Sequence, residues 1–166
     1  MAVSTTIDHL LACDATLRGI ARDCRATARP CGRDLPSCRW CHLEMPDLPG
    51  VSPMHLPSCP AGQAELALWP GLSGPISRSA RMSVWALCPP DAAFTSDRQF
   101  SVNLREIGGN DPPARFCAAV EARGLVPWAW RAWAGSAHEA LSLARRSIEA
   151  WYGPDARAWR FTWEEG

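Results

Sequence analysis

Cysteine and histidine are the residues of this 166-residue chain best suited to holding a metal ion. Cys38 and Cys41 form a CxxC pair, whose short turn lets two thiolates face one tetrahedral ion. His55 follows after thirteen residues and Cys59 after three more, giving the pattern C-x2-C-x13-H-x3-C. Zinc takes four sulfur and nitrogen ligands in structural sites, so we expect these residues to bind zinc.

Other ligand sets fit the same segment. Cys31 could replace His55 to make a four-cysteine site, and His42 is a second substitute. The residues Cys38 to His42 also read C-x-x-C-H, the pattern for covalent haem attachment. The simplest alternative is a set of reduced thiols in an ordinary core, which suits the four cysteines on apolar faces: Cys13, Cys24, Cys88 and Cys117.

Residues 36 to 66 resemble a C2HC-type zinc finger or zinc knuckle, on the strength of this cysteine and histidine spacing. The resemblance implies a structural zinc ion in a knuckle, a ribbon or a ββα finger. Residues 30 to 62 are rich in Pro, Gly, Cys and Ser and lack a sustained apolar period, so they have little apolar surface to bury. A metal ion would supply the folding free energy that such a segment lacks.

A row of arginines precedes the cysteines. Residues 5 to 28 have the apolar period of a helix, on which Arg18, Arg22, Arg25 and Arg29 form one basic stripe, continued by Arg33 and Arg39. Arginine suits phosphate because its planar guanidinium donates two parallel hydrogen bonds. The stripe indicates a nucleic-acid surface, an acidic protein partner or a plain solvated face, and three aspartates dilute its charge: Asp14, Asp23 and Asp34.

Tryptophans are concentrated in the second half of the chain. In the segment 126–133 the alternation places Trp128 and Trp130 on one face of a strand and Arg131 and Trp133 on the other. Core packing accounts for the first pair. Arg131 and Trp133 are candidates for contact with a ligand or partner, because exposed tryptophan often anchors a protein interface.

The composition limits the class of protein. Seventeen basic residues, all arginine, balance seventeen acidic ones, so no overall field attracts nucleic acid or an anionic membrane. The absence of lysine resembles coding by GC-rich DNA and hints at a bacterial or bacteriophage source. We expect a cytoplasmic protein without membrane association, because the N-terminus lacks a signal peptide pattern and no apolar run of about 18 residues occurs.

The pattern of elements predicts an α+β fold. An N-terminal helix and zinc-bound loop module would span residues 1–66, followed by a linker at 67–81 and an α+β domain at 82–166. That domain would have the order ββαβαβ, with helices at 111–124 and 136–152 on one face of a four-stranded sheet. The 111–124 helix rests on Asp111-Pro112 as a start signal and on Gly124 as a stop.

No catalytic constellation is evident, since only Glu44 could serve as an acid or base near the metal. We therefore expect a non-catalytic, zinc-stabilised binding or regulatory protein that acts on nucleic acid or a nucleoprotein complex, such as an accessory protein of a phage or mobile element. The alternative is a protein-binding inhibitor or adaptor, for example against host defence, that uses the tryptophan-rich half. A metal-dependent enzyme is the third hypothesis. The oligomeric state cannot be predicted from these patterns.

Overall fold

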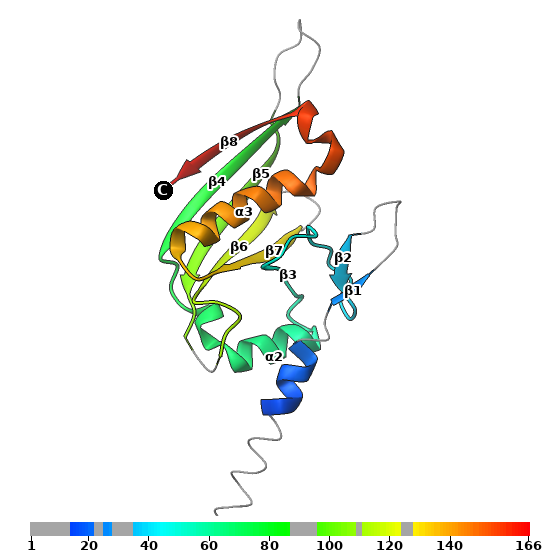
Figure 1. Cartoon of the computed structure of the whole chain (residues 1–166), viewed down its shortest axis with the longest axis vertical. Coiled ribbons are helices and arrows are strands. Elements are labelled where there is room, and N and C mark those ends of the chain that lie inside the picture. Colours follow the sequence, from blue (N-terminus) through cyan, green and yellow to red (C-terminus); the bar gives the residue numbers. More distant parts are fainter. Residues whose placement is uncertain (1–13, 22–24, 28–34, 87–95, 109–110, 124–127) are drawn as a thin grey trace, which may run out of the picture.

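The computed structural model describes residues 14–21, 25–27, 35–86, 96–108, 111–123 and 128–166. Its main feature is a six-stranded antiparallel sheet with the strand order β3-β7-β6-β5-β4-β8 (Figure 1). The strands are β3 (Val51–Pro53), β4 (Arg78–Ala86), β5 (Ser96–Glu106), β6 (Phe116–Arg123), β7 (Ala129–Ala134) and β8 (Trp159–Glu165). A separate two-stranded sheet pairs β1 (Arg25–Thr27) with β2 (Pro36–Cys38).

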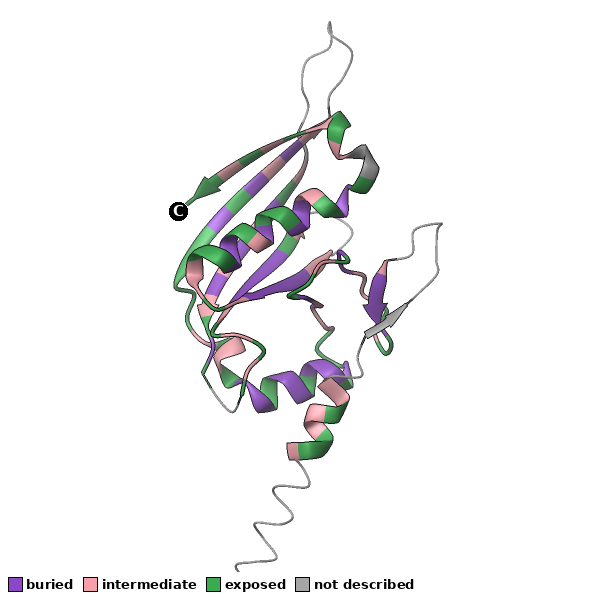
Figure 2. Cartoon of the chain, in the orientation of Figure 1, coloured by how far each residue is buried: buried purple, intermediate pink, exposed green. Residues whose placement is uncertain are grey.

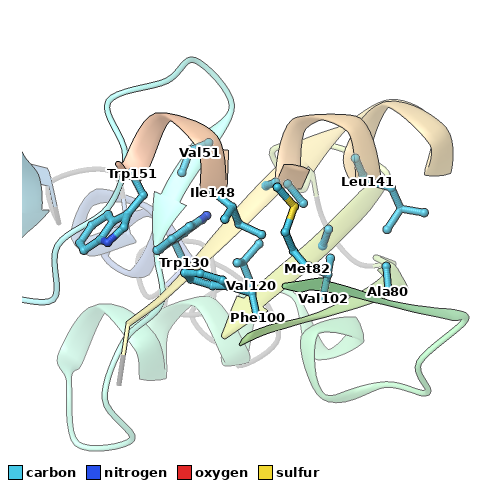
Figure 3. Close-up of a cluster of buried hydrophobic side chains, with 14 of the residues drawn as sticks. Val51, Ala80, Met82, Phe100, Val102, Val120, Trp130, Leu141, Ile148 and Trp151 are labelled. Atoms are coloured by element: carbon cyan, nitrogen blue, oxygen red, sulfur yellow. The ribbon is translucent and has the colours of Figure 1, made fainter. Parts of the chain in front are cut away.

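Helix α3 (Ala137–Trp151) covers one face of the large sheet. It begins at Ser136, whose hydroxyl accepts a hydrogen bond from the backbone N–H of Glu139, as the capping pattern predicts. Its apolar stripe lies over the inward side chains of the central strands. Figure 3 shows the resulting core, in which Trp130 stacks on Trp151 with ring centroids 5.1 Å apart and donates its indole N–H to Ser147.

Helix α2 (Pro60–Leu68) lies towards the opposite face, and the short 3-10 helix η1 (Pro70–Ser73) follows it. The Trp69 ring meets the Trp133 ring edge-on at 5.7 Å. Together with three further buried side chains these rings form a second apolar cluster: Leu68, Ile107 and Cys117. Figure 2 shows buried positions along α2 as well as along the sheet and α3. A second 3-10 helix, η2 (Gly153–Ala158), connects α3 to β8.

The mixed α and β class is confirmed, but three finer predictions are wrong. The sheet has six strands rather than four, and α3 is the only helix packed on its inner face within the described residues. The segment predicted as a helix at 111–124 contains strand β6 instead. Asp111 has a φ of +53°, a left-handed conformation that does not begin a helix, and consecutive residues from Cys117 to Val120 are buried between β5 and β7.

The N-terminal helix is confirmed in part, since residues 14–21 are helical. The prediction that it continues to residue 28 is wrong, because residues 25–27 form β1. How independently residues 1–66 and 82–166 fold stays a prediction. The structure does connect them, because β3 pairs with β7 and β4 begins at Arg78, inside the predicted linker.

Among the described residues, no helix has both the length and the apolar character needed to cross a membrane.

Candidate metal centre

The first half of the site is a tight turn at the end of β2. Cys38 is the last residue of that strand, and the backbone N–H of His42 donates to its carbonyl at 2.9 Å. The backbone N–H of Trp40 points at the Cys38 sulfur from 3.4 Å. His42 closes the turn with a φ of +56°, a left-handed conformation that histidine adopts more readily than most residues. This geometry turns Cys38 and Cys41 towards one point.

The second half comes from the loop between β3 and α2. The backbone N–H of Cys59 donates to the carbonyl of Leu56 at 2.9 Å, closing a turn that brings His55 and Cys59 together. Cys59 is also the N-cap of α2, with Pro60 at the first helical position. The N-terminal end of α2, the positive end of its dipole, therefore lies beside this sulfur.

The four ligand atoms of Cys38, Cys41, His55 and Cys59 all lie within 4.8 Å of one another. The Cys38 and Cys59 sulfur atoms are 3.7 Å apart, too far for a disulfide. The Nδ1 atom of His55 lies 3.5 Å from the Cys59 sulfur and 3.8 Å from that of Cys41. Tetrahedral zinc with ordinary bond lengths separates two sulfurs by about 3.8 Å, and sulfur from nitrogen by about 3.6 Å. The donor set and its spacing therefore fit a zinc ion.

The other side of the His55 ring faces a buried ion pair. Its Nε2 atom lies 3.4 Å from the Glu65 carboxylate on α2, and the second oxygen of that carboxylate accepts a hydrogen bond from Arg131 on β7. The Glu65 side chain is 4% exposed and that of Arg131 is 9% exposed, so water screens the pair only weakly. A carboxylate behind a ligating histidine fixes which ring nitrogen faces the metal.

Helix α2 approaches His55 closely enough to require a glycine. A Cβ atom added at Gly62 would lie 2.7 Å from the Cβ of His55, closer than two carbon atoms can approach without displacement. Gly62 and Glu65 are therefore parts of the site that the cysteine and histidine spacing did not reveal. Their only signal in the sequence is the Pro60 start of a helix directly after Cys59.

The two thiols of the turn differ in their electrostatics. Burial raises the pKa of Cys38. Burial also acts to raise the pKa of Cys41, but hydrogen bonds outweigh it and lower the pKa to about 7. The largest come from the backbone of Leu43 and Leu56, followed by those with the side chains of His55 and Cys38. A metal binds the thiolate rather than the thiol, so a low pKa favours coordination near neutral pH.

The predicted alternates have different positions. His42 is exposed and does not belong to the cluster. Cys31 lies outside the described residues, as do three of the cysteines predicted for apolar faces: Cys13, Cys24 and Cys88. The fourth, Cys117, is buried as expected, and burial raises its pKa to about 12. The structure therefore assembles the ligand set first predicted.

The arginines predicted to form one basic stripe do not share a helix in the part of the chain that the structure describes. Arg18 is half-buried and forms a 2.8 Å ion pair with Asp14, with Asp111 at 3.5 Å. Arg25 belongs to β1 rather than to a helix. Arg39 is exposed on the metal-binding turn. The remaining members, Arg22, Arg29 and Arg33, lie outside the described residues.

Arg131 and Trp133, predicted to face a ligand or partner, are both buried. Arg131 is occupied by Glu65, and the Trp133 indole N–H donates to the Ser52 hydroxyl at 2.8 Å. Trp133 lines a cavity of about 520 Å³ between the helical residues 14–21 and the sheet, and Glu65 and Trp69 line it too. Arg131 therefore belongs to the polar contact behind His55, and Trp133 to the apolar cluster around Trp69.

Comparison of the chain with protein-family models, with curated protein sequences and with solved structures found no significant match. The assignment of function therefore rests on the geometry of the site.

Proposed function

We propose that Cys38, Cys41, His55 and Cys59 bind one structural zinc ion. The observation that carries this proposal is the convergence of one nitrogen and three sulfur atoms at tetrahedral separations, with a carboxylate behind the histidine ring. Four protein ligands leave no open coordination position, which is typical of structural rather than catalytic zinc. Catalysis through Glu44 is correspondingly disfavoured.

Cobalt substitution tests the coordination. Co²⁺ in a tetrahedral site with three thiolates gives strong visible absorption and a thiolate charge-transfer band, which octahedral cobalt lacks. We expect these bands in the wild-type protein and their loss or shift in His55→Ala. The matched control is His42→Asn, which removes the neighbouring exposed imidazole and keeps a residue that tolerates positive φ. Equal spectra for all three proteins would remove His55 from the ligand set.

We further propose that the zinc-bound turn binds single-stranded nucleic acid, free or within a nucleoprotein complex. Trp40 is 37% exposed at the tip of the turn, and the Arg39 guanidinium lies 5.9 Å from its ring centroid. An exposed aromatic ring stacks on a base, and an adjacent arginine neutralises a phosphate. His42, exposed on the same turn, adds a second polar side chain.

Protein binding through the buried tryptophans of the second half has less support. Trp130, Trp133 and Trp151 are buried and serve the apolar clusters of the sheet. They offer no exposed aromatic surface of the kind that anchors a protein partner. The turn around Trp40 is therefore the better candidate for the binding surface.

Binding of a labelled single-stranded oligonucleotide tests this role. Trp40→Ala should weaken binding by about 5- to 150-fold, because stacking on one base contributes about 1–3 kcal/mol. Ile76→Ala is the control, since it removes a similarly exposed apolar side chain far from the turn in sequence. Arg39→Ala should flatten the slope of log K against log salt by about 0.7. The proposal would be contradicted if wild-type affinity did not change with salt concentration, or if Trp40→Ala and Ile76→Ala weakened binding equally.

A further inference from the structure

Strand β8 forms an edge of the sheet whose open side has no partner strand among the described residues (Figure 1). It is seven residues long and pairs with β4 without a break in register. The other edge strand, β3, has three residues and ends in Pro53. Short strands, prolines, bulges and charged side chains protect sheet edges from pairing with another chain. Strand β8 has no proline, lysine or bulge, and its charges are of both signs: Arg160, Glu164 and Glu165.

The backbone groups available on this edge follow from the pairing with β4. The N–H of Gly166 donates to the carbonyl of Ser79, and hydrogen-bonded pairs alternate along an antiparallel ladder. Hydrogen-bonded pairs therefore also join Glu164, Thr162 and Arg160 to β4, so the backbone groups of these residues face β4. The N–H and C=O groups of Phe161 and Trp163 face the open side, where they can pair with a second strand.

The sequence of β8 is complementary to itself in one antiparallel register. Pairing two copies about Thr162 places Arg160 of one chain opposite Glu164 of the other, twice by symmetry. It also places Phe161 opposite Trp163, and these two residues have their hydrogen-bonding groups on the open side. Opposite charges and paired aromatic rings both stabilise cross-strand neighbours.

We propose that two copies of this chain associate through β8 in this register and form one continuous twelve-stranded sheet. Shifting the register by two residues in either direction preserves the hydrogen bonding but separates Arg160 from Glu164. It also leaves part of the strand unpaired, whereas pairing about Thr162 uses all seven residues. Charge complementarity and strand length thus select the same arrangement.

The inner face of β8 supports the proposal. Helix α3 packs chiefly on β7, β6 and β5, and the β8 end of that face is covered by Tyr152, which contacts the rings of Trp159 and Phe161. Phe161 and Trp163 remain only half-buried in a single chain. A second copy would bury more of both rings against their counterparts, which is favourable for apolar surface.

A charge exchange tests the register. Light scattering with size-exclusion chromatography, on metal-loaded full-length protein over a concentration series, should give a mass twice that of one chain for the wild type. Arg160→Glu and Glu164→Arg each place like charges opposite one another, so each should weaken the dimer by tenfold or more. The double variant restores opposite charges and should recover dimerisation.

Two further variants distinguish loss of the dimer from loss of the monomer fold. Arg157→Glu makes the same charge change just outside the strand and should leave the dimer intact. Glu165→Pro removes an N–H that faces the open side and none that β4 uses, so it should weaken the dimer without unfolding the monomer, as checked by circular dichroism. A monomeric wild type at all concentrations, or single variants that dimerise like the wild type, would overturn the proposal.

Discussion

The metal centre and the sheet are held together by different means. The cluster around the candidate metal site contains three buried hydrophobic residues among those described, Cys38, Cys59 and Ala61, and two of these belong to the proposed ligand set. The cluster beneath α3 contains eighteen such residues among those described. Apolar burial stabilises the sheet by about 25 cal/mol per Å² of surface removed from water, whereas the metal centre has little such surface. We therefore propose that the first region depends on an ion for its stability and that the second does not.

The two regions meet through a buried polar contact. Glu65 on α2 faces His55 on one side and accepts a hydrogen bond from Arg131 of β7 on the other. This pair connects the proposed ligand His55 to β7, the second strand of the sheet order, next to the edge strand β3. Loss of the proposed ion should therefore destabilise α2 first and the sheet only afterwards.

The largest effect should follow the loss of a ligand. Cys59→Ser should reduce bound zinc from about one ion per chain to a small fraction and unfold the metal centre, because structural zinc contributes an apparent binding free energy of about 10–16 kcal/mol in small domains. Metal analysis with circular dichroism measures both effects. Cys117→Ala is the control, because it changes a buried cysteine outside the cluster and should retain the ion. Equal zinc loss in both variants would contradict the assignment.

A core substitution should produce the reverse pattern. Trp130→Ala removes a fully buried ring from beneath α3 and should reduce the free energy of unfolding by about 3–5 kcal/mol, measured by urea denaturation. Zinc content under native conditions should stay unchanged. Leu66→Ala, at an exposed position of α2, should change stability by less than about 0.5 kcal/mol. Zinc loss from the Trp130 variant while it is still folded would mean that the two regions are not separable.

The contact between the regions predicts an intermediate effect. Arg131→Met leaves Glu65 buried without its cation, and should weaken zinc binding by about 10- to 100-fold, as loss of a partner behind a ligating histidine does. Competition with a chromogenic chelator measures this affinity. The double variant Arg131→Met with Glu65→Gln no longer has the uncompensated charge. It should recover part of the free energy of unfolding that Arg131→Met loses, because the two residues form one ion pair. Fully additive losses in the double variant would argue against the pair.

The smallest effect should come from Gly62→Ala. Alanine favours a helix over glycine by about 1 kcal/mol, but its methyl group would press on His55, and such overpacking costs about 1–3 kcal/mol. We expect a small net loss of stability and a severalfold loss of zinc affinity. Leu66→Ala, at an exposed position of the same helix, should leave affinity unchanged. An unchanged zinc affinity in Gly62→Ala would show that α2 can move away from the ligand.

The sequence predicted the cluster of cysteines and histidine better than the residues that surround it. Cysteine and histidine spacing is a local signal, so Cys38, Cys41, His55 and Cys59 could be grouped without knowing the fold. Glu65 and Arg131 are sixty-six residues apart and meet only because β3 pairs with β7. Strand β3 has three residues including a proline, too short to show an alternating pattern.

The helix at 136–152 was predicted well, and the strand of small buried residues in β6 was not. The helix at 136–152 has both a capping signal and an apolar stripe, and it is present as α3. Strand β6 contains Cys117, Ala118, Ala119 and Val120, all buried, so it lacks the alternation of a half-exposed strand. Alanine also favours helices, and Asp111-Pro112, which precedes β6, resembles the start of a helix. Both signals led to the wrong prediction of a helix at 111–124.

Removal of the metal tests the central claim most directly. Hydrogen exchange measured by mass spectrometry should be compared between zinc-loaded protein and protein treated with a strong chelator under reducing conditions. We expect one zinc ion per chain before treatment, and afterwards a selective loss of protection at residues 36–42 and 55–62, with α3 and the strands it covers still protected. No stoichiometric metal, or unchanged protection of both regions after chelation, would contradict the account.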